Sequence, residues 1–220
     1  MRKTLSEAAR ARLSAGMRRV VVSGNPRLGE GIVQAIVAGL WRHVDTALVE
    51  AMNGRLWDGR AAELYARRVH AGLLDKGNKP YTGHLMRVAA RARAHAEALG
   101  WPPERAQLVA DAGWLHDTIE DTPVDSIDLM EAGFDPVVIA AVGRLTKPKG
   151  VPYLDAIRAL IATGDAVAVL VKLADNEDNT DMARPGSAQL TMEQIDRYLR
   201  SAAMLRAAVE DIRAGGDDAG

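Results

Sequence analysis

The chain has no cysteine and few aromatic residues, and both shortages limit what it can do. Without cysteine, disulfides, thiolate zinc sites and cysteine nucleophiles are excluded, so any metal must be held by His and carboxylate ligands. Aromatic residues make up only 4% of the 220 residues, so Ala, Leu, Val and Ile must fill the core. An Ala-rich sequence with few β-branched runs favours helices over sheets.

Long apolar runs are also missing. No stretch is long enough to span a membrane, and residues 1–15 lack the apolar segment of a secretory signal. Charged residues (26%) and hydrophobic residues (48%) occur at the frequencies of ordinary globular domains. We therefore expect a cytoplasmic protein.

Charge is unevenly spread along the chain. Residues 1–75 hold 12 Lys and Arg against 7 Asp and Glu, whereas residues 76–220 hold 16 against 22. The basic first part could contact nucleic acid or a partner, but a solvated helix face is the simpler interpretation. No interleaved aromatic residues or RNA-binding signature accompany it, which argues against nucleic acid.

From about residue 60 onward, apolar residues recur at helical spacing between clear turn signals. Asp135-Pro136 and Thr191 to Gln194 are typical helix starts, the second resembling a capping box. The apolar run 166–171 fits a helix or a buried strand. Helices are expected over Gly59–Leu74, Tyr81–Gly100, Pro103 to the Thr122-Pro123 stop, Asp125–Ala132, Pro136–Leu145, Tyr153–Ala162, Asp165–Asp175 and Thr191 to about Arg213.

These signals divide the chain into three parts. Residues 1–58 form a basic N-terminal extension of helical or mixed structure, which could mediate a homo-oligomer or bind a protein partner. Residues 59–213 form the main domain, and the Gly- and Asp-rich residues 214–220 form a disordered tail.

The string Leu115-His-Asp-Thr-Ile-Glu-Asp-Thr122 carries the strongest chemical signal. If it is helical, His116 and Glu120 share a face at i,i+4, and so do Asp117 and Asp121. An exposed acidic helix end with a capping role is the plainer alternative. It is disfavoured because negative charge opposes the helix dipole at a C-terminus. A bound divalent cation would relieve the repulsion among these carboxylates.

Two residues elsewhere could complete such a site. His84 follows a glycine near the start of an expected helix, and Asp175 ends an apolar run. Each is a weak signal alone, since a single His is more often structural. Together with His116 and Asp117 they specify a mixed nitrogen and oxygen site for an octahedral metal.

The ordered set His84, His116-Asp117 and Asp175 resembles the HD superfamily of metal-dependent phosphohydrolases. The resemblance is closest to the hydrolase domains of RelA/SpoT-type proteins and the small alarmone hydrolases, and it covers roughly residues 60–206. The segments that carry it are Tyr65-Ala-Arg-Arg-Val-His70, Lys76-Gly-Asn-Lys-Pro-Tyr-Thr-Gly-His84, Leu115 to Thr122, Leu145-Thr-Lys147 and Val171-Lys-Leu-Ala-Asp175.

The resemblance implies an all-α HD-domain bundle holding one divalent metal, Mn²⁺ above others. It implies the four ligands His84, His116, Asp117 and Asp175. Glu120 and Asp121 match the acidic pair that orients and deprotonates the attacking water. Substrate contacts are implied for Lys76, Asn179 and Tyr198, and we expect Lys147 to neutralise phosphate charge.

The implied activity is hydrolysis of (p)ppGpp-like nucleotides, with release of the 3′-diphosphate as pyrophosphate. Three positions depart from the family pattern: Asp75 replaces an Arg beside the base, Asn176-Glu-Asp-Asn179 replaces Arg-Leu-His/Tyr-Asn, and Gln194 replaces a frequent Arg. These departures fit an HD nucleotidase acting on another nucleotide. An antitoxin-like binding module is a second alternative.

Overall fold

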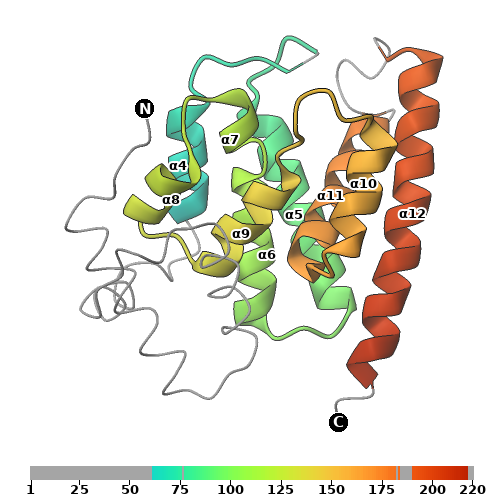
Figure 1. Ribbon diagram of the computed structural model, residues 1–220. Coiled ribbons are helices and arrows are strands. Elements are labelled where there is room, and N and C mark those ends of the chain that lie inside the picture. Colours follow the sequence, from blue (N-terminus) through green and yellow to red (C-terminus); the bar gives the residue numbers. More distant parts are fainter. Residues whose placement is uncertain (1–60, 76, 182, 184–189, 218–220) are drawn as a thin grey trace, which may run out of the picture.

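The computed structural model describes residues 61–75, 77–181, 183 and 190–217, and these residues form an all-α bundle (Figure 1). The expected extension at residues 1–58 and the expected substrate contact Lys76 lie outside the described residues. The helices are α4 Ala61–Val69, α5 Thr82–Ala98, α6 Pro103–Leu115, α7 Thr118–Asp121, α8 Ser126–Glu131, α9 Pro136–Leu145, α10 Tyr153–Ala162, α11 Ala166–Thr180 and α12 Met192–Asp217.

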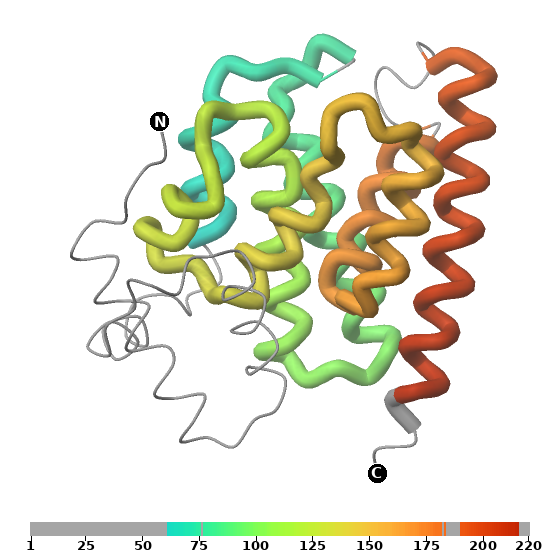
Figure 2. The backbone as a smooth tube through the Cα atoms, viewed as in Figure 1, coloured from blue at the N-terminus to red at the C-terminus, as the bar shows by residue number. Residues whose placement is uncertain are grey.

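Helices α5, α6 and α11 pack against one another in the interior. Helix α4 packs on α6 with α7 and α8 nearby, while α10 and α12 cover α11 on the other side (Figure 2). The core consists largely of Ala, Val and Leu, as the composition predicts. Gly113 of α6 lies so close to α5 that a Cβ there would stand 2.7 Å from the Cα of Ala89. Small residues thus bring together the two helices that carry His84 and His116.

Four of the predicted helix starts, those of α8, α9, α11 and α12, carry side-chain caps. The Asp135 carboxylate accepts a hydrogen bond from the Val137 amide at the start of α9. At α12, the Gln194 side chain accepts from the Thr191 amide, and the Thr191 hydroxyl accepts from the Gln194 amide. This is the expected capping box. Gln194, which replaces a frequent Arg of the family pattern, therefore caps the start of α12.

Three boundaries differ from expectation. Helix α4 ends at Val69 rather than near Leu74, because the chain turns through Gly72, whose φ of 84° lies in the left-handed region. The apolar run 166–171 is helical, as expected, but α11 continues past Asp175 to Thr180. Helix α12 continues to Asp217, past the expected end near Arg213 and into the segment expected to be disordered.

The most consequential difference is a break in the helix that was expected to run on to Thr122. The backbone leaves the helical region at Asp117 (φ −98°, ψ 1°), so α6 ends at Leu115 and the short α7 begins at Thr118. The interpretation of residues 116–121 as one continuous helical face is therefore wrong. The turn separates His116 and Asp117 from Glu120 and Asp121.

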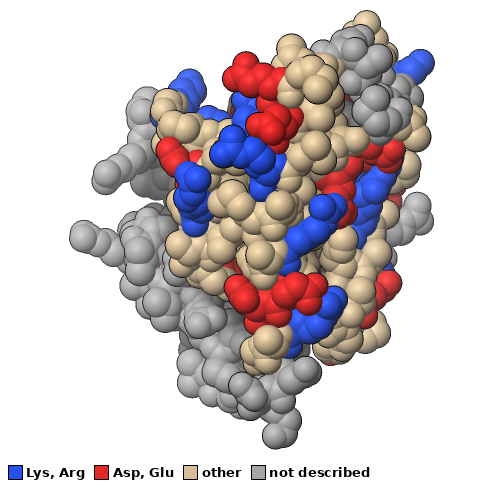
Figure 3. Space-filling view, turned by 90° about the vertical axis from the view of Figure 1, so that its right-hand side faces the viewer, with Lys and Arg blue, Asp and Glu red and all other residues tan. Residues whose placement is uncertain are grey.

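On the face shown in Figure 3, basic and acidic side chains are interspersed among other residues, and no broad patch of one sign gathers there. Several pairs are bridged, such as Arg158 with Asp155 at 2.6 Å. None of the helices in the described part of the chain combines the length and apolarity that crossing a membrane requires.

Candidate metal centre

Three interior helices bring the four expected ligands together. His84 lies in the first turn of α5, His116 directly follows α6, Asp117 forms the α6–α7 junction, and Asp175 lies in α11. Both imidazoles and Asp175 are buried, with 2–6% of their surface exposed. Ligand atoms of His84, His116 and Asp117 lie within 4.8 Å of one another. Asp175 Oδ1 lies 3.4 Å from His84 Nε2 and 3.9 Å from His116 Nε2.

The two ring nitrogens of His116 have different surroundings: Nδ1 contacts a backbone carbonyl, and Nε2 faces the other expected ligands. Its Nδ1 lies 2.8 Å from the Gly113 carbonyl oxygen, which can only accept, so Nδ1 carries the proton of the neutral ring. Nε2 is buried and has no hydrogen-bond partner, although Asp117 Oδ2 lies 2.9 Å away. The contact between His116 Nε2 and Asp117 Oδ2 lacks hydrogen-bond geometry. In the neutral ring, the lone pair of Nε2 therefore faces a carboxylate oxygen.

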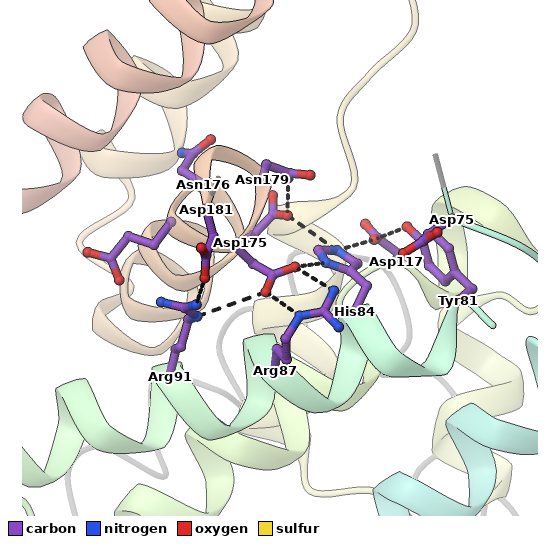
Figure 4. Close-up of polar contacts among 12 residues, drawn as sticks. Asp75, Tyr81, His84, Arg87, Arg91, Asp117, Asp175, Asn176, Asn179 and Asp181 are labelled. Carbon is purple, nitrogen blue, oxygen red and sulfur yellow. Dashed lines mark hydrogen bonds and ion pairs between the residues drawn. The ribbon is translucent and has the colours of Figure 1, made fainter. Parts of the chain in front are cut away.

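His84 shows the same arrangement. Its Nδ1 lies 2.7 Å from Asp178 Oδ2, while Nε2 faces Asp175 and also Asp117 Oδ2 at 3.7 Å (Figure 4). Burial disfavours the charged ring, but the carboxylates of Asp117, Asp175 and Asp178 outweigh burial and raise the pKa of His84 well above its usual value.

Asp117 and Asp175 are held ionised by their neighbours. Burial favours the neutral acid, but His116 and His84 hold the pKa of Asp117 well below its usual range. Lys172 donates to Asp175 Oδ2 at 2.9 Å and, with the two histidines, holds the pKa of Asp175 below its usual range despite burial. The Tyr81 hydroxyl donates to Asp117 Oδ2 at 2.5 Å.

This donor set fits a divalent cation. The Nε2 atoms of His84 and His116 and the carboxylates of Asp117 and Asp175 converge on one buried region, and two buried carboxylates are costly unless positive charge lies between them. A mixed imidazole and carboxylate set suits Mn²⁺, Fe²⁺ or Zn²⁺, and the absence of cysteine excludes thiolate-based selection.

The acidic pair expected to act on water lies outside this cluster. Glu120 and Asp121 are exposed on α7, and Glu120 accepts a hydrogen bond from the Lys147 backbone amide at 3.1 Å. Burial first, and then Asp117 and Asp121, raise the pKa of Tyr81, which places Asp121 close to that hydroxyl. The pair therefore forms a rim beside the buried ligands.

The expected substrate contacts occupy different environments. Asn179 lies one turn after Asp175, and its side-chain amide donates to Asp175 Oδ1 at 2.7 Å. Tyr198 is buried edge-on to Tyr153, between α10 and α12. The ammonium of Lys147 donates to the carbonyls of Pro148 and Val151 within its own loop.

The sequence patterns assign no role to four further residues at the site. Asp178, Lys172 and Tyr81 each bond to one of the four expected ligands, and Arg87 bonds to Asp178. Asp178 and Arg87 each lie one turn after a ligand on the same helix. That spacing was visible, but which helix faces which was not.

Asp75, which replaces an Arg of the family pattern, has a structural task. Its buried carboxylate accepts hydrogen bonds from the backbone amides of Gly77 and Lys79, at 2.8 and 3.0 Å. It thereby organises the turn that leads into α5.

Residues 81–180, which contain all four expected ligands, match the family model described as the HD domain. This part of the chain is an HD domain. No curated protein matches the chain.

The HD domain also has a similar solved structure. A metazoan ortholog of SpoT, described as hydrolyzing ppGpp and playing a role in starvation responses, matches with 25% identity and a TM-score of 0.54. The match covers 70% of this chain and 86% of the other. The HD domain and this likeness together support a phosphohydrolase activity.

Proposed function

We propose that the protein is a metal-dependent phosphohydrolase that holds one divalent ion, Mn²⁺ above others, through His84, His116, Asp117 and Asp175. The observation that supports it best is the pair of buried Nε2 atoms, each directed at carboxylate oxygens while its Nδ1 is committed elsewhere. When bound, such an ion supplies Lewis-acid activation of water and of a phosphoryl oxygen.

The chain's own residues supply the proton transfer. Glu120 lies at the rim of the cluster and would accept a proton from the attacking water, with Asp121 orienting that water. The Lys147 amide holds the Glu120 carboxylate in place. Tyr81 orients Asp117, and Lys172 orients Asp175 and keeps it ionised.

For the substrate we propose a (p)ppGpp-like nucleotide. Water would attack the phosphorus attached to the 3′ oxygen, the bond between them would break, and the 3′ oxygen would take up a proton as pyrophosphate leaves. The similar metazoan structure and the ordered motifs support this choice. Lys76 and Lys147 belong to two of those motifs and would balance diphosphate charge, while Asn179 and Tyr198 would contact the nucleotide.

A substrate panel tests the proposal. Metal-free protein is reloaded with Mn²⁺ and offered ppGpp, pppGpp, dNTPs, NMPs and NADPH, and products are separated by ion-exchange chromatography. Pyrophosphate and the matching 5′-nucleotide should appear from the two alarmones alone. Turnover of another class would identify a different HD nucleotidase, and no turnover by a metal-loaded protein would favour a binding module.

We further propose that residues 59–213 act as one catalytic domain and that residues 1–58 serve an oligomer or a protein partner. Deleting residues 1–58 should leave turnover intact and change the mass measured by light scattering or the proteins recovered in a pull-down. Loss of turnover on deletion would contradict this division.

A further inference from the structure

Helices α5 and α11 contact each other through two residues on each helix, and the two residues of each helix lie one turn apart. His84 and Arg87 of α5, which Figure 4 labels, lie opposite α11. Their partners on α11 are Asp175 and Asp178. The His84 ring therefore stands between two carboxylates of the same helix. Its Nε2 is 3.4 Å from Asp175 Oδ1, and its Nδ1 is 2.7 Å from Asp178 Oδ2.

A neutral imidazole carries one proton, so the two carboxylates compete for it. If the proton sits on Nε2, the ring cannot offer that nitrogen to a metal. The 2.7 Å contact has the length of a charge-assisted hydrogen bond, whereas 3.4 Å on the other side is long. The proton therefore belongs on Nδ1, and the Nε2 lone pair is left for the ligand cluster.

Asp178 can do this because it is itself held rigidly. Its side chain is fully buried, and Arg87 donates a hydrogen bond to each oxygen. Nε lies 2.7 Å from Oδ1, and Nη2 lies 3.1 Å from Oδ2. The hydrogen bond to Asp178 raises the pKa of Arg87, so the guanidinium stays charged and compensates the buried carboxylate. Arg91 adds a weaker contact at 3.9 Å.

We propose that Asp178, clamped by Arg87, is a positioning residue that fixes the His84 tautomer and ring orientation for metal binding. Carboxylates in this position behind a ligating histidine raise its basicity, and their loss weakens metal affinity about 10–100-fold. The inference rests on the metal site of the proposed function but not on the identity of the substrate.

Asp178→Asn tests it with little change of shape. Arg87 Nε and His84 Nδ1 bond to different oxygens of Asp178, and an amide keeps an acceptor oxygen at only one of these two positions. Long-range ¹H–¹⁵N correlation spectra of the metal-free protein, at a pH where the ring is neutral, should show His84 protonated on Nδ1 in the wild type. In the variant an Nε2-protonated population should appear, and calorimetric Mn²⁺ affinity should fall about 10–100-fold.

Asp181→Asn is the matched control. Asp181 also pairs with an arginine of α5, Arg91, but does not contact His84. It should keep the wild-type tautomer and Mn²⁺ affinity. Should Asp178→Asn fail to fold, Arg87→Lys replaces it, since Arg87 is partly exposed and a lysine keeps the charge but loses the two-point grip. Its Mn²⁺ affinity should fall by less than that of Asp178→Asn.

The inference would be overturned if Asp178→Asn kept the wild-type His84 tautomer and Mn²⁺ affinity. The same result in Arg87→Lys would overturn it if Asp178→Asn does not fold. An equal loss in Asp181→Asn would overturn it too, because the effect would then be a general disturbance of α11. Failure of the wild type to bind Mn²⁺ or other divalent ions would instead overturn the proposed function. The two failures are therefore distinguishable.

Discussion

The buried ligand cluster and the exposed rim differ in how their residues are held. In the cluster, His84, His116 and Asp175 come from packed helices, and each bonds to a second protein group that orients it. On the rim, Glu120 and Asp121 lie exposed on the four-residue α7, and one backbone amide holds Glu120.

This difference suggests a division of labour. Ligand geometry tolerates little error, so it is built from rigid helices with supporting contacts. A proton acceptor must meet water and release its proton, so exposure serves it. Changes in the cluster should therefore remove the metal, whereas changes on the rim should remove turnover and spare the metal.

The largest effect is expected for His116→Ala. It deletes a proposed ligand whose Nε2 lies 2.9 Å from Asp117 Oδ2, so Mn²⁺ binding and hydrolysis should both be abolished and added Mn²⁺ should no longer raise Tm. Metal content by mass spectrometry checks this. His95→Ala is the control, since His95 pairs with Glu177 away from the cluster. Normal metal content in His116→Ala would sink the assigned site.

Glu120→Gln should lose about 10²–10⁴-fold in kcat because it keeps the shape of the side chain but removes the base. Mn²⁺ affinity should remain at the wild-type value, which separates rim from cluster. Glu104→Gln, an exposed change in the first turn of α6, is the control. A near-normal kcat in Glu120→Gln would transfer the role to Asp121.

Gly113→Ala should lower the free energy of unfolding by about 1–3 kcal/mol, because the new Cβ must push α6 away from Ala89 of α5. The shift also moves the carbonyl that holds His116, so Mn²⁺ affinity should fall in step. Gly143→Ala meets no atom within 4 Å and should be neutral or stabilising. Urea unfolding of both variants decides; equal stability would show that the close approach is not required.

The smallest effect is expected for Asp75→Arg. Removing an acceptor of two backbone hydrogen bonds should cost about 1 kcal/mol of unfolding free energy. It should not lower KM for ppGpp, because the carboxylate serves the turn. Asp75→Asn keeps an acceptor oxygen and should be milder. A lower KM in Asp75→Arg would instead place this position at the nucleotide base.

Local sequence patterns predicted most of the helices because their signals are local. Caps such as Asp135 and the Thr191–Gln194 box, together with helical spacing of apolar residues, need no distant partner. The His116-Asp117 pair likewise stood out against an apolar run. The break at Asp117 has no local sequence signal, and the Asp117 carboxylate is bound by Tyr81, 36 residues earlier in the chain.

The sequence by itself determined the all-α class, the exclusion of thiolate chemistry, and which His and Asp residues resemble a metal site. Only the tertiary structure decided that α5 and α11 face each other in a register that sets Asp178 behind His84. It also decided that Asp75 serves a turn. Periodicity fixes which residues share a helix face, but packing between helices chooses their partners, and that choice depends on the whole core.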